Sequence, residues 1–155
     1  LPPARLAARR VREWSMEHNE TPIRQLSDQE CWEQLATQDV GRLVTRVRDV
    51  IDIFPVNYVV DGESIVLRTA EGSKLVELVI SEDVLFEVDE HTDSDAWSVI
   101  LRGKARRLER ASEIEAADAL PLKPMVPTLK RNYVRIVPTS MSGRHFVFGE
   151  EPSRG

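Results

Sequence analysis

Residues 67–75, with the sequence LRTAEGSKL, bring together side chains that can bind an anion. A predicted strand ends at Arg68 and Thr69, and a predicted helix begins at Ser73 and Lys74. A helix start offers unpaired backbone N–H groups and a partial positive charge, which suit a phosphate. Arg68 can add a bidentate guanidinium and Lys74 a point charge, while Thr69 and Ser73 supply hydroxyl donors. The segment therefore predicts a phosphate site, although its spacing also fits an ordinary strand–turn–helix capped by Ser73.

A proline within a strand pattern marks a second candidate site. Residues 51–60 alternate as a strand, yet Pro55 cannot donate a hydrogen bond to a neighbouring strand. It therefore predicts an edge or bulge at which the following residues Val56, Asn57 and Tyr58 keep unpaired backbone groups. A planar ring with a polar rim can bind such groups. The alternative is that Pro55 only protects the edge from pairing with another chain.

The N-terminal part of the chain predicts two helices. Residues 4–18 carry one apolar stripe at helical spacing, and residues 19–25 form a polar break. Ser27 and Glu30 have the spacing of a capping box, which starts a helix of about ten residues that ends before Gly41.

After that helix the apolar period becomes two, which is typical of β-strands. The predicted strands cover residues 41–48, 51–60, 64–69, 84–89, 97–108, 131–137 and 144–148. Asp61-Gly62 predicts a hairpin turn, and helices are expected at 72–80 and at 112–119, the latter with a Ser112–Glu115 capping box. Short antiparallel strands with a few inserted helices predict a mainly β, barrel-like domain with flanking helices. No GxGxxG or GxxxxGK[ST] spacing favours a nucleotide-binding parallel sheet.

Composition narrows the functional class. The chain has 155 residues with 41% hydrophobic content, which supports one domain, and its net charge of −5 argues against a general nucleic-acid binder. No apolar run approaches the ~20 residues of a membrane span, and no signal-peptide core is seen, so a cytoplasmic protein is expected. The lone Cys31 is expected to be a packed thiol. The cluster Arg5, Arg9, Arg10 and Arg12 fits a solvated helix face or an anion site.

No conventional catalytic constellation is present. The three histidines, His18, His91 and His145, lack the spacing of metal ligands, and His91 lies in an acidic stretch typical of a solvated loop. There is no GxSxG motif, and no acid–base pair stands out. We therefore predict no metal site and assign no catalytic residue. A bound cofactor that carries the reactive atom would account for this absence.

Four segments in the observed order resemble the pyridoxamine 5′-phosphate oxidase-like superfamily of flavin-binding split β-barrels, especially its short bacterial branch. They are residues 41–45 (GRLVT), 54–58 (FPVNY), 67–75 (LRTAEGSKL) and 99–105 (VILRGKA), and the resemblance covers roughly residues 26–148. It implies a dimeric split β-barrel of the FMN-binding type. Residues 1–25 are then an N-terminal helical extension and residues 149–155 a flexible tail.

The resemblance also implies the residues of a cofactor site. The phosphate is expected on the strand–turn–helix side chains, namely Arg68, Thr69, Ser73 and Lys74. The ring is expected along the proline-containing strand, namely Pro55, Val56, Asn57 and Tyr58. A second chain is expected to complete the site with Trp97, Ser98 and the Ser142-Gly143-Arg144 segment.

The implied function is that of an FMN-dependent oxidoreductase that transfers a hydride between the flavin and a small planar substrate. Two alternatives remain open: use of the deazaflavin F420, whose anionic tail can meet the arginine-rich first helix, and a non-catalytic flavin carrier or sensor. Vitamin B6 oxidation is not predicted, because the adjacent Arg144 and His145 do not match that enzyme's substrate-binding arginine and histidine. We expect a homodimer, since residues 97–108 show apolar groups on both faces, unless the helix at 112–119 covers the outer one.

Overall fold

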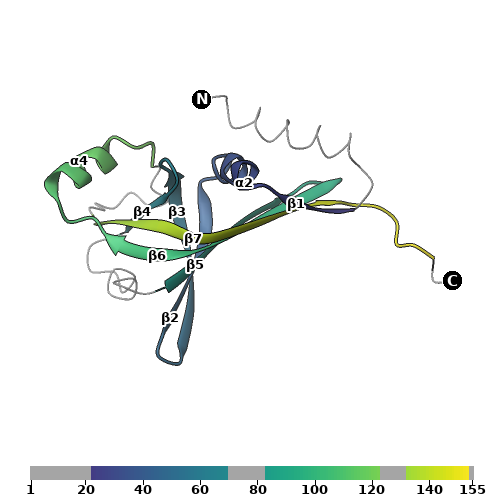
Figure 1. The fold of residues 1–155 in the computed structure, drawn as a ribbon, viewed down its shortest axis with the longest axis horizontal. Coiled ribbons are helices and arrows are strands. Elements are labelled where there is room, and N and C mark those ends of the chain that lie inside the picture. Colours follow the sequence, from purple (N-terminus) through teal and green to yellow (C-terminus); the bar gives the residue numbers. More distant parts are fainter. Residues whose placement is uncertain (1–21, 70–82, 123–131, 154–155) are drawn as a thin grey trace.

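The computed structural model describes residues 22–69, 83–122 and 132–153 of the chain. Seven strands and two helices lie within these ranges (Figure 1). The strands are β1 Ile23–Leu26, β2 Val40–Val47, β3 Val50–Val60, β4 Ile65–Thr69, β5 Asp83–His91, β6 Asp95–Arg107 and β7 Asn132–Val147. The helices are α2 Asp28–Leu35 and α4 Ala111–Asp118.

The strands form an antiparallel barrel that is closed by β7. Their order is β1-β7-β4-β3-β2-β5-β6, and β6 pairs again with β7, so strands β2 to β7 complete a ring. Residues 132–136 of β7 pair with β4, whereas residues 143–146 pair with β1. One long strand is thus shared between two parts of the sheet, and the predicted mainly β split-barrel fold is confirmed.

The period-two pattern of the strands sorts their residues into an inner and an outer set. In β6, Val99 and Leu101 are fully buried, whereas Ile100 is 44% exposed and Arg102 and Lys104 are also exposed. The expectation of apolar residues on both faces of this strand therefore holds only for Ile100 on the outer side. The alternative that the helix at 112–119 covers that side is wrong, because α4 packs on Val66 of β4 and not on Ile100.

Helix α2 closes the barrel interior beside the second half of β7. Its capping box is confirmed, since the Glu30 amide donates to the Ser27 hydroxyl and the Ser27 amide donates to the Glu30 carboxylate. Leu35 and Cys31 are fully buried, and burial raises the pKa of the Cys31 thiol to about 11. A Cβ atom at Gly143 would lie 2.5 Å from the Cys31 sulfur, so the helix sits directly on the strand. The expected packed thiol is confirmed.

Three local predictions are wrong. Residues 23–25 of the expected polar break form β1 together with Leu26, and this strand pairs with residues 143–146. The two expected C-terminal strands are one strand, β7, which tolerates its polar middle because a bulge opposite Arg102 and Gly103 takes up an extra residue. Helix α4 starts after Arg110 without a side-chain cap, so the Ser112–Glu115 box does not form.

The outer surface of the barrel has two parts. Helix α4 and the loop after it cover one part, where Val66, Leu108, Ala117 and Tyr133 are buried together. The other part, which we call the open face, consists of outward residues on β2, β3, β5 and β6: Val44, Ile51, Ile53, Leu85 and Ile100. Both described helices pack elsewhere. Neither of them has the length and apolarity needed to cross a membrane.

Candidate functional site

The described part of the predicted phosphate site lies at the end of β4. This strand sits between β3 and β7, and its alternation buries Leu67 inside the barrel and turns Arg68 to the outer surface. Arg68 is paired across the strands with Tyr133, and its guanidinium carbon lies 5.9 Å from the centre of the Tyr133 ring. The register therefore fixes the position of the cation.

Thr69 ends the strand with a buried hydroxyl. The residue is 5% exposed, and its Oγ1 has no hydrogen-bond partner in the part of the chain that the structure describes. A buried polar atom without a partner is costly, so this hydroxyl is suited to a ligand. Arg68 and Thr69 are adjacent and leave opposite faces of β4, so an anionic group can meet this cation and this donor together at the end of the strand. Ser73 and Lys74 lie outside the described residues.

Pro55 lies where one edge of β3 has no partner strand among the described residues, which fits the predicted edge or bulge. It pairs with Arg42 of β2, but the pairing of β3 with β4 begins only at Tyr58. Pro55 is exposed, and Asn57 is half-buried and donates from Nδ2 to the Asp39 carbonyl at 3.2 Å. If the β3–β4 register continues by one residue, it brings Asn57 beside Arg68. On that register, the outer residues of the predicted phosphate subsite and the predicted ring subsite lie side by side.

The inward residues of β3 belong to the core. Val56 is 7% exposed and Tyr58 is 3% exposed. The Tyr58 hydroxyl donates to the Leu35 carbonyl at 2.5 Å, and its ring meets Phe86 edge-on. Burial raises the pKa of Tyr58 above its ordinary range, so it stays a neutral donor. A ligand on the outer surface can reach Val56 and Tyr58 only through their backbone.

The residues expected from a second chain form cross-strand pairs between β6 and β7. Ser98 is paired with Arg144, and Trp97 with His145. Ser98 and Arg144 lie on the outer surface, whereas Trp97 is buried in the core with its Nε1 unpartnered among the described residues. Arg144 lies eleven residues beyond Tyr133 on β7, a contour of about 36 Å at about 3.3 Å per residue. Arg68 and Arg144 therefore belong to different parts of the barrel surface.

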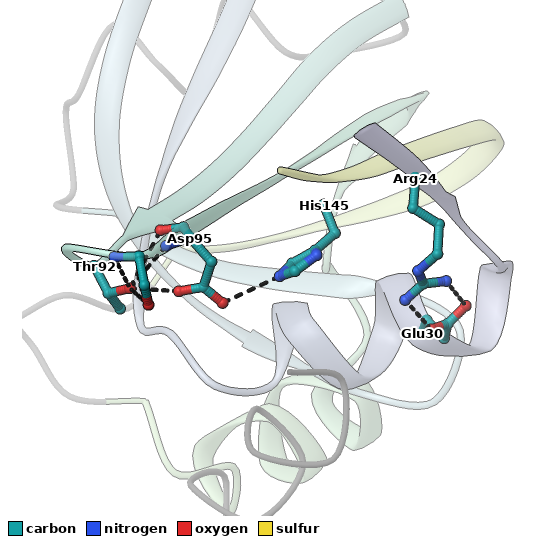
Figure 2. Close-up of polar contacts among 6 residues, drawn as sticks. Arg24, Glu30, Thr92, Asp95 and His145 are labelled. Atoms are coloured by element: carbon teal, nitrogen blue, oxygen red, sulfur yellow. Dashed lines mark hydrogen bonds and ion pairs between the residues drawn. The ribbon is translucent and has the colours of Figure 1, made fainter. Parts of the chain in front are cut away.

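A buried polar network at the α2 end of the barrel was not predicted from the sequence (Figure 2). His145 Nε2 lies 3.1 Å from Asp95 Oδ2, and the Thr92 hydroxyl donates to the same carboxylate. Nearby, Arg24 makes two hydrogen bonds to Glu30, at 2.8 and 3.1 Å, which lower the pKa of that carboxyl group. The His145–Asp95 contact joins residues 50 positions apart, so no local sequence motif could predict it.

This network connects the start of β6 to the end of β7, and among the described residues it forms no metal site. Asp95 begins β6 and His145 lies near the end of β7, while the Thr92 amide donates to the Asp95 carbonyl across the turn. Within residues 22–69, 83–122 and 132–153, no group of three His, Cys, Asp or Glu residues gathers as a metal site. The histidine is therefore best understood as part of the barrel's internal bonding.

The chain is similar to several known proteins. A Corynebacterium glutamicum structure assigned to the pyridoxamine 5′-phosphate oxidases is 50% identical, with a TM-score of 0.79, over 85% of this chain and 98% of that one. A Mycobacterium smegmatis structure, described as an FAD binding protein, is 41% identical with a TM-score of 0.73, over 80% of this chain and 98% of that one. A functionally uncharacterised Mycobacterium tuberculosis protein is 42% identical over 95 residues, which are 61% of this chain and 86% of that protein.

The family model agrees with these similarities and with the fold. The model for pyridoxamine 5′-phosphate oxidase matches residues 27–145, which run from the cap of α2 to near the end of β7. The match includes β3, β4 and the paired strands β6 and β7, which carry all the described candidate site residues. On this evidence the chain belongs to the pyridoxamine 5′-phosphate oxidase family.

Proposed function

We propose that this protein binds a flavin nucleotide at the end of β4, with FMN as the first candidate. The observation that carries the proposal is the combination of Arg68 with the buried Thr69 hydroxyl, which has no partner among the described residues, next to the edge of β3 that no described strand pairs with. This arrangement offers an anion site and a row of backbone hydrogen-bonding groups side by side. A flavin nucleotide presents a phosphate and a planar ring with a polar rim, which match the two parts.

In this proposal the chain binds and orients a cofactor, and the cofactor supplies the reactive atom. A bound flavin would supply hydride transfer to or from a small planar substrate, which makes the protein an oxidoreductase. Arg68 and Thr69 hold the phosphate, and the β3 backbone from Pro55 to Asn57 holds the ring edge. Ser73 and Lys74 are proposed to complete the phosphate site. The lack of an evident acid or base among the site residues agrees with this division of roles.

We further propose that two copies of the chain form the functional unit. The open face exposes Ile51 by 67%, Ile53 by 61% and Ile100 by 44%. In its middle, Arg42 is already paired with Glu87 at 2.7 Å and Asp89 at 3.2 Å, so the charge of Arg42 is compensated when this face is covered. A second copy related by a two-fold axis would cover the apolar residues with the same patch.

The second copy also resolves the separation between the two sets of site residues. Ser98 and Arg144 lie far along β7 from Arg68 of the same chain. In a dimer that pairs the open faces, Ser98 and Arg144 of one protomer can approach the ring held by its partner. The proposed site is therefore shared between protomers.

FAD is a second candidate ligand, because the 41% identical Mycobacterium smegmatis neighbour is described as an FAD binding protein. Both flavin nucleotides carry the phosphate that Arg68 would bind. The deazaflavin F420 remains a third proposal, whose suggested contact with the arginine-rich first helix lies outside the described residues. A non-catalytic carrier would bind the same ligands without turnover.

The test is fluorescence titration of the purified protein with FMN, FAD and F420. We expect a micromolar or tighter dissociation constant for FMN, about −8 kcal/mol or better. Arg68→Ala should weaken FMN binding by roughly 1.5–3 kcal/mol, the value of a hydrogen bond to a charged group. Arg110→Ala, which removes an exposed arginine at the start of α4, away from the open face, is the matched control and should change binding little. Folded protein that binds none of the three ligands would contradict the proposal.

A further inference from the structure

Arg68 is one member of a row of three side chains on the outer surface. The Tyr133 ring lies beneath its guanidinium at 5.9 Å, and the Tyr133 hydroxyl donates to the carboxylate of Asp118. Asp118 is the last residue of α4, which packs through Ala117 against Val66 and Tyr133. The row thus runs from a cation, through an aromatic ring, to an anion on the covering helix.

Each side chain in this row limits the position of the next one, from Asp118 through Tyr133 to Arg68. Tyr133 is only 2% exposed, so its ring has a fixed position between β4 and α4. Burial and the bond to Asp118 raise the pKa of Tyr133, which keeps the hydroxyl protonated as a donor. A phenol that donates to a carboxylate gains electron density in its ring. A more electron-rich ring attracts a cation more strongly, because the attraction is electrostatic.

We propose that Tyr133, held by Asp118, is a positioning residue that orients the Arg68 guanidinium toward the phosphate of the bound flavin nucleotide. This inference rests on the proposed function. Neither Tyr133 nor Asp118 touches the ligand in this arrangement. The ring replaces water on one face of the guanidinium and limits its rotamers, so that less side-chain freedom is lost when the phosphate binds.

The experiment compares two probes that differ only in the phosphate. FMN and riboflavin are titrated against the full chain, and the ratio of their dissociation constants isolates the phosphate contribution. Arg68→Ala should reduce the preference for FMN about tenfold or more. Tyr133→Leu should reduce it about fivefold, and Tyr133→Phe and Asp118→Asn about twofold, because the last two keep the ring. In all four variants riboflavin binding should stay as in the wild type.

Two further variants separate positioning from general structural damage. Glu115→Gln removes the same charge from α4 one turn earlier and should leave the ratio unchanged. Tyr133→Leu added to Arg68→Ala should change the ratio no further, because the ring then has no cation to orient. Should Tyr133→Leu fail to fold, Tyr133→Phe and Asp118→Asn carry the same test with the packing retained.

The outcomes distinguish this inference from the proposed function. If Arg68→Ala reduces the preference for FMN while the Tyr133 and Asp118 variants do not, the positioning role is wrong and the phosphate site stands. The same holds if Tyr133→Leu acts equally with and without Arg68. If Arg68→Ala leaves the ratio unchanged, the phosphate site itself is wrong and the positioning role falls with it.

Discussion

The two parts of the barrel's outer surface differ in what covers them. Under α4, Val66 is fully buried and Leu108 and Tyr133 are 2% exposed. On the open face, Ile51 and Ile53 keep more than half of their surface exposed. Both parts carry apolar residues on outward strand positions, which need a cover to be stabilising. The chain therefore covers the part beside Arg68 with its own helix, whereas no described helix covers the open face, which the proposed second copy would bury.

An aspartate placed under α4 should have the largest effect. Ala117 is 1% exposed between α4 and the barrel, so Ala117→Asp buries a carboxylate with no described cation at hand. Because the apolar residues Val66, Leu108 and Tyr133 surround this position, we expect a loss of about 3 kcal/mol or more in the free energy of unfolding. Chemical denaturation at several protein concentrations is the measurement. Stability within 1 kcal/mol of the wild type would mean that α4 is not firmly packed.

An aspartate placed on the open face should weaken dimer formation and leave the fold of the protomer intact. Ile53 is 61% exposed in the single chain, so Ile53→Asp buries nothing within the protomer. In a dimer it would place a charge against apolar surface, and we expect dimer affinity to fall about a hundredfold, or about 2.7 kcal/mol. Sedimentation over a dilution series measures it, with Ile53→Val as the control that should remain dimeric. A dimer unaffected by Ile53→Asp would place the interface elsewhere.

Local sequence patterns predicted the parts of the fold that local physics decides. The capping box at Ser27 needs only two residues three positions apart, and it forms. The turn after β3 also forms, with Gly62 at a φ of +61° and paired amide and carbonyl groups of Asp61 and Ser64. The period-two alternation predicted strands at β2 and β6, and both strands form, because one face of each is buried when the barrel closes.

The features of the fold that were not predicted depend on pairing between strands that lie far apart in the sequence. Strand β1 has only four residues and pairs with a distant part of β7, as in the pair Ile23 and Phe146, which are 123 positions apart. The continuous β7 crosses a polar stretch that local patterns treat as a loop, because β6 pairs with it along almost its whole length. The site follows the same rule: Arg68 was predicted from its motif, but its contact with Tyr133 depends on β4–β7 register. The roles of Ser73 and Lys74 stay predictions.

The smallest predicted effect concerns the hairpin that carries the open face. Beyond Val44 no described strand but β3 pairs with β2, so the end of this hairpin lies outside the barrel wall (Figure 1). Arg48 in its turn has a φ of 56°, a conformation that favours glycine. Relief of the side-chain strain outweighs the greater freedom of glycine in the unfolded chain. Arg48→Gly should therefore raise the free energy of unfolding by about 0.5–1 kcal/mol.

Asp49→Gly is the matched control, because Asp49 has no positive φ and its replacement should destabilise the turn by about the same amount. Both changes leave the apolar side chains of the open face untouched, so they report on the hairpin alone. Measured again in the Ile53→Asp background, an equal gain from Arg48→Gly means that the hairpin is already ordered in the single protomer. A gain confined to the dimeric protein means that the partner orders it. Thermal and chemical denaturation of the four variants decide between these results, and a loss of stability on Arg48→Gly would contradict the strained turn itself.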